Sequence, residues 1–241
     1  SSSPLFYDSD GYFDVDCIYT WGKLQQDIIQ SKTKYLGVGE CRNYGNPYWD
    51  KLYLASRNIN GSLNIRKLLF PEKIKYILLY LGQADSFHFF ASFIKSFEAT
   101  DDLGIIVKPH PYENSDKYSK ILNKSNISFK IITDEYELSD IINVCDIAYT
   151  YTSTTGINVI LENKPLIILN FQHEKGIFFC GDSTDIVITE NPEEMKNFTI
   201  KLLTDTEFSN TIIKAQSNFI KDRIVCNGNA TINIVNDLIY N

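Results

Sequence analysis

Three hydroxyl side chains stand together in the middle of the chain, where the residue types are typical of a strand, a tight turn and a helix start. Ser153, Thr154 and Thr155 follow the β-favouring run 147–151 and precede the apolar-periodic segment 157–161. A helix start presents unpaired backbone N–H groups and the positive end of the helix dipole. We therefore expect these hydroxyls to surround an anion site with a phosphate as its guest. The alternative is that Ser153 or Thr154 only caps the helix, the commoner use of these residue types.

A histidine between two prolines follows a second strand signal. The run 104–108 is apolar up to Lys108, and Pro109 and Pro111 then flank His110. Each proline fixes its own backbone and restricts the residue before it, so His110 lies in a stiff corner just past the strand. In an open α/β sheet this edge is where ligands bind. We expect His110 and the hydroxyl cluster to open on the same edge, unless His110 is only an exposed turn residue.

Four other polar positions and one glycine are weaker candidates. Gly82 and Gln83 directly follow another predicted strand, and a glycine lets a ligand approach the backbone closely. Lys108 adds positive charge near the histidine, or is a solvated lysine at a strand end. His173 follows a later strand on the same expected edge. His88 lies between two phenylalanines, and we expect it to pack rather than to bind a ligand.

Strands and helices must alternate to bring these loops together. From residue 75 onward, short apolar runs alternate with segments of helical periodicity. This alternation predicts βαβ units, and therefore an α/β fold with a Rossmann-like parallel sheet flanked by helices. The predicted strands are 76–81, 104–108, 129–132, 147–151, 165–169 and 186–188, and the predicted helices are 87–97, 118–122, 138–144, 193–203, 208–220 and 232–240.

The amino-terminal part of the chain gives shorter signals and a break. Strands are predicted at 15–19 and 34–38, and helices at 23–30 and 48–54. Asparagine, glycine and proline then give residues 56–72 the composition of a linker. We predict three parts: 1–58 as the remnant or end of an incomplete N-terminal α/β domain, 59–73 as a linker, and 74–241 as the nucleotide-binding, Rossmann-like domain.

Composition narrows the function classes. The chain has 23 Lys and Arg against 30 Asp and Glu, a net charge of −7, and no long basic run, so we expect no nucleic-acid partner. The five cysteines form no C-x-x-C pair, which favours a reduced, cytosolic compartment. No apolar run approaches the ~20 residues of a transmembrane helix. No Asp-x-Asp lies where a sugar-nucleotide metal loop is expected, so we expect neither a metal nor a cofactor.

The two loops and their surroundings resemble a known family. The segments Val107-Lys-Pro-His-Pro111, 146–156 and Glu162-Asn-Lys-Pro165 are similar to the carboxyl-terminal half of GT-B glycosyltransferases that build bacterial surface polysaccharides. Within that family they resemble capsule transferases that use CMP-activated Kdo or sialic acid, and CDP-glycerol glycerophosphotransferases of teichoic acid synthesis. Residues 19–23 and 43–50 resemble the passage where those enzymes leave their amino-terminal domain.

The resemblance implies a transferase in the cytoplasm, with peripheral association at the inner face of the cell membrane as a further expectation. Its donor would be a CMP-sugar or a CDP-linked molecule, and its acceptor a glycan or glycolipid. His110 would be the catalytic residue, which stabilises the charge of the leaving phosphate. In such proteins the His-Pro pair, here His110 and Pro111, and the Ser/Thr cluster, here Ser153, Thr154 and Thr155, bind the phosphate of the nucleotide. Together with Gly82, Gln83 and Lys108, which their positions after strands suggest, and with Glu162, these residues are the predicted nucleotide and phosphate ligands. Glu162 would bind the ribose, or is simply an exposed helix glutamate.

Two alternatives and one departure from the family remain. A sugar-nucleotide isomerase of the 2-epimerase type shares parts of these motifs, and so would a non-catalytic module that kept the fold. A chain of 241 residues is short for two Rossmann-like halves of about 100 to 200 residues each. The sole methionine is Met195. We therefore expect a part of a longer protein, with most of the acceptor half absent.

Overall fold

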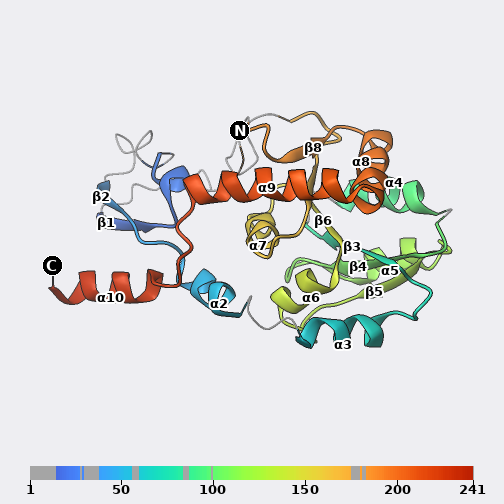
Figure 1. The fold of residues 1–241 in the computed structure, drawn as a ribbon, viewed down its shortest axis with the longest axis horizontal. Helices are drawn as coiled ribbons and strands as arrows, with labels where there is room; N and C mark the ends of the chain where they lie inside the picture. Colours follow the sequence, from blue (N-terminus) through green and yellow to red (C-terminus); the bar gives the residue numbers. More distant parts are fainter. Residues whose placement is uncertain are drawn as a thin grey trace.

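Six parallel strands form the central sheet. The structure, a computed structural model, describes residues 15–27, 29, 38–55, 60–83, 87–98, 100–174, 180 and 183–240. The strands lie in the order β5-β4-β3-β6-β7-β8 (Figure 1). Their bounds are β3 Tyr76–Leu81, β4 Leu103–Lys108, β5 Ser128–Ile131, β6 Ile147–Thr150, β7 Leu166–Leu169 and β8 Val187–Thr189. Every neighbouring pair is parallel, so the predicted α/β fold with a parallel sheet is confirmed.

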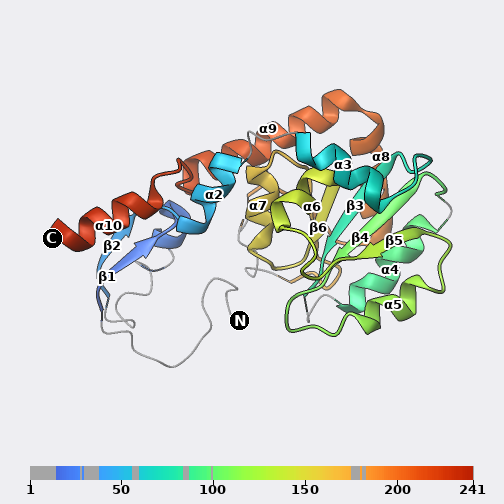
Figure 2. The same cartoon turned by 90° about the horizontal axis from the view of Figure 1, so that it is seen from below.

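Helices cover both faces of this sheet. They are α3 Asn60–Leu69, α4 Phe87–Phe97, α5 Asp116–Leu122, α6 Leu138–Val144, α7 Thr155–Leu161, α8 Pro192–Thr204 and α9 Thr206–Arg223. Figure 2 shows α3 and α6 on one side of the sheet and α4 and α5 on the other. Phe90, Phe93 and Phe97 recur at helical spacing on α4 and are buried. Because both faces are covered, the strands are apolar on both sides, and five of the six residues of β3 are buried.

The order of the strands creates one switch point. The chain passes from β3 to β4 and on to β5, and then returns to the other side of β3 to form β6. The strands that follow β3 are therefore added first on one side of it and then on the other. In open α/β sheets, ligands bind outside the carboxyl ends of the strands at such a point. The loops after β3, β4 and β6 all open there.

A second, smaller unit lies at the other end of the molecule. Strands β1 (Val15–Thr20) and β2 (Val38–Asn43) form a two-stranded parallel sheet, followed by α2 (Pro47–Ala55). The last helix, α10 (Ala230–Tyr240), lies beside this sheet rather than the large one (Figure 1). Helix α9 leads the chain back to it from α8.

Polar contacts attach α10 to the amino-terminal residues. The Asp237 carboxylate accepts hydrogen bonds from the hydroxyls of Tyr19, at 2.8 Å, and Tyr44, at 3.0 Å, and pairs with Arg42. The Asp50 carboxylate accepts from the backbone N–H of Ala230, at 3.0 Å, where α10 begins. Residues nearly two hundred positions apart in the chain are thus held together.

The segment 59–73 is not an irregular linker, because most of it forms helix α3. Leu69 and Phe70 are buried against the core, which accounts for the helix despite the asparagines and glycine at its start. Whether a domain boundary lies here stays a prediction. Residues 34–37 of one predicted strand lie outside the described residues, and the strand that follows them is Val38–Asn43.

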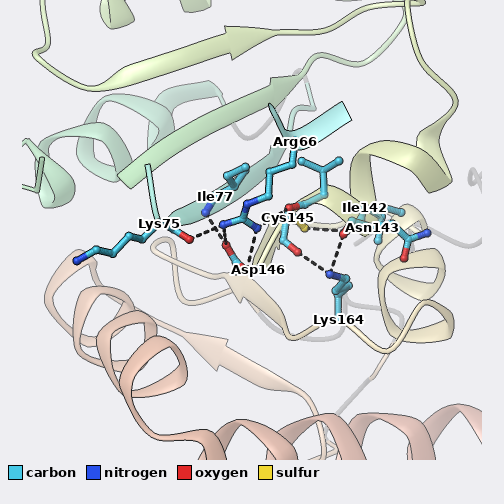
Figure 3. A network of polar contacts seen from close by, with 9 residues as sticks. Arg66, Lys75, Ile77, Ile142, Asn143, Cys145, Asp146 and Lys164 are labelled. Atoms are coloured by element: carbon cyan, nitrogen blue, oxygen red, sulfur yellow. Dashed lines mark hydrogen bonds and ion pairs between the residues drawn. The ribbon is translucent and has the colours of Figure 1, made fainter. Parts of the chain in front are cut away.

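A network of polar contacts fastens α3 to the amino edge of the sheet (Figure 3). The Arg66 guanidinium donates to both carboxylate oxygens of Asp146, at 3.3 and 3.1 Å, and to the carbonyl of Val144 at 3.1 Å. Asp146 in turn accepts from the N–H of Ile77 at 2.7 Å, which joins β3 to the start of β6. This network lies at the edge opposite the switch-point loops and holds the two strands in register.

Two kinds of feature are absent from the described part of the chain. None of its helices is both long enough and apolar enough to span a lipid bilayer. Within the same residues, no group of three or more His, Cys, Asp or Glu side chains is placed to hold a metal ion.

Candidate functional site

The candidate site lies at the carboxyl edge of the sheet, across its switch point. β3 is hydrogen-bonded to β4 on one side and to β6 on the other. Neighbouring strands are about 4.8 Å apart, so β4 and β6 end about 10 Å from each other. The His110 loop and the Ser153 loop therefore open on the same edge, as expected. Their separation suits a ligand larger than one phosphate group, such as a nucleotide.

His110 lies in a tight turn just past β4. The N–H of Glu113 donates to the carbonyl of His110 at 2.8 Å, which closes the turn. The N–H of Tyr112 donates to Nδ1 of the imidazole at 3.3 Å. Because Nδ1 accepts this bond, the neutral ring carries its hydrogen on Nε2. The side chain is exposed, so Nε2–H is a donor that a ligand can reach.

Glu113 is a residue of this site that the sequence reasoning missed. Its side chain is only 2% exposed and pairs with the Lys117 ammonium. The carboxylate also accepts from the backbone N–H of His110, at 2.9 Å, and from the Tyr118 hydroxyl, at 3.0 Å. A carboxylate three residues after a histidine, in a turn, was a signal that could have been read. Glu113 fixes the backbone that carries the imidazole.

Gly82 lies close to side chains of the protein itself, and its expected contact with a ligand stays a prediction. A Cβ at this position would lie 2.5 Å from the Tyr118 hydroxyl and 2.9 Å from the Glu113 carboxylate. The glycine therefore makes room for the buried carboxylate. Its N–H donates to the Lys108 carbonyl at 2.8 Å, which joins the ends of β3 and β4. The close approach that requires a glycine is thus to the protein's own side chains.

Gln83 connects the end of β3 to the hydroxyl loop. Its Oε1 accepts from the N–H of Thr152 at 2.9 Å and from the Thr152 hydroxyl at 3.2 Å. This contact spans the switch point directly. Gln83 therefore holds the loop that follows β6 in position.

The hydroxyl cluster is organised by Ser153. Its hydroxyl accepts from the N–H of Thr155 at 3.2 Å and donates to the Thr155 hydroxyl at 2.9 Å. Thr154, the N-cap of α7, makes no capping bond with its side chain. Ser153, one residue before the N-cap, thus bonds the first N–H of the helix, and whether the loop also binds an anion stays a prediction. Helix α7 has only seven residues, so the hydroxyls and the loop backbone, rather than a long helix dipole, are the groups offered to a ligand.

Lys108 and Pro111 lie close to His110 in the chain, but their surroundings differ. The Lys108 ammonium donates to the carbonyl of Thr133, in the loop after β5. Its charge is therefore directed toward β5, although it still adds positive potential to this edge. Pro111 is exposed in the turn after His110.

Two predicted site residues are not brought to the switch point. Glu162 follows the last turn of α7, about 10 Å along the helix axis from Thr155 at 1.5 Å per residue. It is 8% exposed, and its Oε2 accepts from the Asn143 amide at 3.2 Å. Burial raises the pKa of its carboxyl group. The expectation of an exposed helix glutamate is wrong, because the side chain is enclosed between α6 and α7.

His173 lies on the same edge but is engaged elsewhere. It follows β7, and its Nδ1 lies 3.3 Å from a carboxylate oxygen of Glu190. Its backbone φ of 55° is in the left-handed region, which is unusual for a residue with a side chain. His88 is exposed, with its Nε2 2.7 Å from the Gln172 amide nitrogen.

Comparison with family models gives one match. Residues 79–171 match the family described as "Capsule polysaccharide biosynthesis protein". The matched residues run from the end of β3 past β7 and include both loops of the candidate site. A comparison with curated protein sequences finds no match.

Several solved structures have the same architecture. The wall teichoic acid polymerase TagF has a TM-score of 0.66 and 17% identity over 93% of this chain and 57% of its own. HepE from Anabaena, in complex with UDP and glucose, has a TM-score of 0.62 and 12% identity over 94% and 64%. Sucrose-phosphate synthase from Thermosynechococcus elongatus has a TM-score of 0.57 and 12% identity over 93% and 58%.

These comparisons show that the chain shares the fold of these solved structures, and they confirm the predicted resemblance to GT-B glycosyltransferases of capsule and teichoic acid synthesis. The chain spans less than two thirds of the length of each of these structures. The part that it spans contains a large parallel sheet together with a small amino-terminal unit.

Proposed function

We propose that this chain binds the nucleotide-activated donor of a glycosyltransferase that builds a capsule or teichoic acid polymer, with cytidine as the base. The observation that carries the proposal is the junction of three loops at the switch point, tied together by Gln83 and Glu113. This junction lies within the segment that matches the capsule polysaccharide family. TagF, of the same fold, was solved with CDPG.

Each loop has a separate part in the proposed chemistry. As the bond to the transferred group breaks, negative charge grows on the phosphate of the leaving nucleotide, and donors aimed at that charge lower the barrier. The Nε2–H of His110 is one donor, because Nδ1 is already occupied by the Tyr112 N–H. The hydroxyl of Thr155 is another, because it accepts the hydrogen of the Ser153 hydroxyl and has a hydrogen of its own to donate. His110 is thus the catalytic residue of the proposal.

The acceptor is proposed to be a glycan or glycolipid that meets the donor at the cytoplasmic face of the membrane. Since the chain spans only part of the length of TagF, we assign it donor binding, and we assign turnover to the whole protein. Neither a metal nor a cofactor takes part in this proposal.

Calorimetric titration with CMP, CDP and UDP tests the proposal. A cytidine nucleotide should bind more tightly than UDP, and His110→Ala should weaken binding by about 1.5 to 3 kcal/mol, the usual contribution of a hydrogen bond to a charged group. His88→Ala is the matched control, because this histidine is exposed and contacts Gln172 instead. Preference for UDP, the nucleotide present with HepE, would favour an isomerase or a uridine-dependent enzyme. Absence of binding would favour a non-catalytic module.

A further inference from the structure

A small pocket adjoins the hydroxyl loop on the side that faces the amino-terminal unit. It has a volume of about 170 Å³. It lies between Trp21, which follows β1, the start of α2, and the start of α7. Its lining residues are Trp21, Asn46, Tyr48, Trp49, Thr154, Thr155 and Asn158.

The pocket is built from groups that are already fixed. The indole N–H of Trp49 donates to the amide oxygen of Asn158 at 2.8 Å, and both residues are buried. The ring of Trp21 meets that of Trp49 edge to face, with 5.5 Å between centroids. Asn46 accepts from the N–H of Tyr48 at 3.0 Å, which holds the start of α2. The pocket therefore does not need a ligand in order to form.

The size of the pocket limits what it can hold. Pockets that enclose drug-sized ligands have volumes of about 300 to 1,000 Å³. A volume of about 170 Å³ is too small for a whole nucleotide and suits one small group. Thr154 and Thr155 belong both to the pocket and to the hydroxyl loop, so such a group would be attached directly to a phosphate bound at that loop.

The lining chemistry selects a neutral group. None of the described residues that line the pocket carries a charge. Aromatic faces, hydroxyls and amides suit a polyol, whose C–H groups pack on rings and whose hydroxyls find hydrogen-bond partners. A carboxylate placed here would lose hydration without gaining a positive partner, which is costly. A sugar acid such as sialic acid or Kdo is therefore a poor fit.

We propose that this pocket binds the uncharged end of the group transferred from the donor, either the glycerol of a transferred glycerol phosphate or an uncharged sugar, rather than a sugar acid. The inference rests on the proposed function, because it assumes a nucleotide phosphate at the hydroxyl loop. It goes further by choosing between the two donor classes that the sequence left open.

The protein contains a direct reporter for this pocket. Its only two tryptophans, Trp21 and Trp49, both line it. CDP-glycerol is the probe whose polyol is uncharged, and it should change the tryptophan fluorescence. The tryptophans are excited at the red edge of their absorption band, where cytidine absorbs little. CDP alone should change it much less. CMP-N-acetylneuraminic acid, the charged probe, should behave like CMP alone.

A variant then separates the pocket from the nucleotide site. Tyr48 is 46% exposed, so Tyr48→Ala should fold. In calorimetry this variant should bind CDP-glycerol about five- to tenfold more weakly than the unmodified chain does, while its affinity for CDP is unchanged. Tyr240→Ala is the control, because Tyr240 is 79% exposed on α10, away from the pocket.

The outcomes distinguish this inference from the proposed function. If CDP binds, but CDP-glycerol does not change the fluorescence and binds with the same affinity as CDP, the pocket inference is wrong and the proposed function stands. Tighter binding of CMP-N-acetylneuraminic acid than of CMP would also overturn it. If neither CMP nor CDP releases heat, the proposed function fails and the pocket inference fails with it.

Discussion

Replacing Glu113 by glutamine tests how His110 is positioned. The substitution preserves the shape of the side chain but removes its charge and turns one acceptor oxygen into a donor. In the structure all three partners of the carboxylate are donors: the His110 N–H, the Tyr118 hydroxyl and the Lys117 ammonium. The glutamine NH₂ must therefore face another donor, and at least one bond is lost.

The size of the effect follows from these contacts. A hydrogen bond to a charged group contributes about 1.5 to 3 kcal/mol. The pair with Lys117, whose side chain is 28% exposed, contributes about 0 to 1 kcal/mol, as near-surface pairs do. Glu113→Gln should therefore lower the free energy of unfolding by about 1.5 to 4 kcal/mol. For a chain of this size that corresponds to a fall in Tm of roughly 3 to 16 °C.

Two measurements decide between positioning and simple structural support. Thermal unfolding gives the loss of stability, with Glu98→Gln as a control because Glu98 is exposed at the end of α4. Calorimetry well below Tm then gives the affinity for CDP, which should fall because a neutral amide holds the His110 backbone N–H less strongly than the carboxylate does. If stability falls while the affinity for CDP is unchanged, Glu113 does not position His110. If neither changes, the hydrogen bonds described here do not matter.

Three further predictions concern parts of the molecule away from the nucleotide loops. Glu162→Gln should leave the affinity for CDP unchanged and should raise Tm at pH 7 but not near pH 4. Burial raises the pKa of Glu162, so its charged form weakens the fold at pH 7, whereas the neutral form that is present below the unfolded pKa does not. A lower affinity for CDP would mean that Glu162 contacts the ligand. The hydrogen bond from Arg42 holds the pKa of Asp237 at about 2, so its contribution to stability is complete above about pH 4 and lost as the pH falls toward 2. The protection of the α10 amides against hydrogen exchange, corrected for the intrinsic rate at each pH, should fall over that window, and constant protection would contradict the prediction. Arg66→Ala should cost roughly 1.5 to 3 kcal/mol of stability in denaturant unfolding with unchanged CDP affinity, because its contacts with Asp146 lie at the opposite edge.

The sequence was informative where local pattern decides the structure. The strand 76–81 and the helices 87–97 and 138–144 were predicted with the bounds that the structure has. Each is an apolar run or an amphipathic repeat of sufficient length, and each is bounded by polar or turn-forming residues. The placement of both candidate loops at one edge also followed, since the carboxyl ends of parallel strands meet there.

Features that depend on tertiary contacts could not be predicted from local sequence patterns. Helix α3 contains asparagine and glycine, and it is stabilised by burial of Leu69 and by the Arg66 network. The spacing of Glu113 from His110 is a local signal, but the burial of its carboxylate against Tyr118 and Gly82 depends on the fold. The sequence likewise could not reveal a pocket that joins Trp21 to Asn158.

The location of CDP bound to crystals of this chain tests the central claim most directly. The claim is that the loops after β4 and β6 share one ligand across the switch point. We expect density for the two phosphates of CDP between the loops, within hydrogen-bond distance of His110 Nε2 on one side and of the Ser153 or Thr155 hydroxyl on the other. A nucleotide that contacts only one of these loops, or that binds at another edge of the sheet, would contradict it.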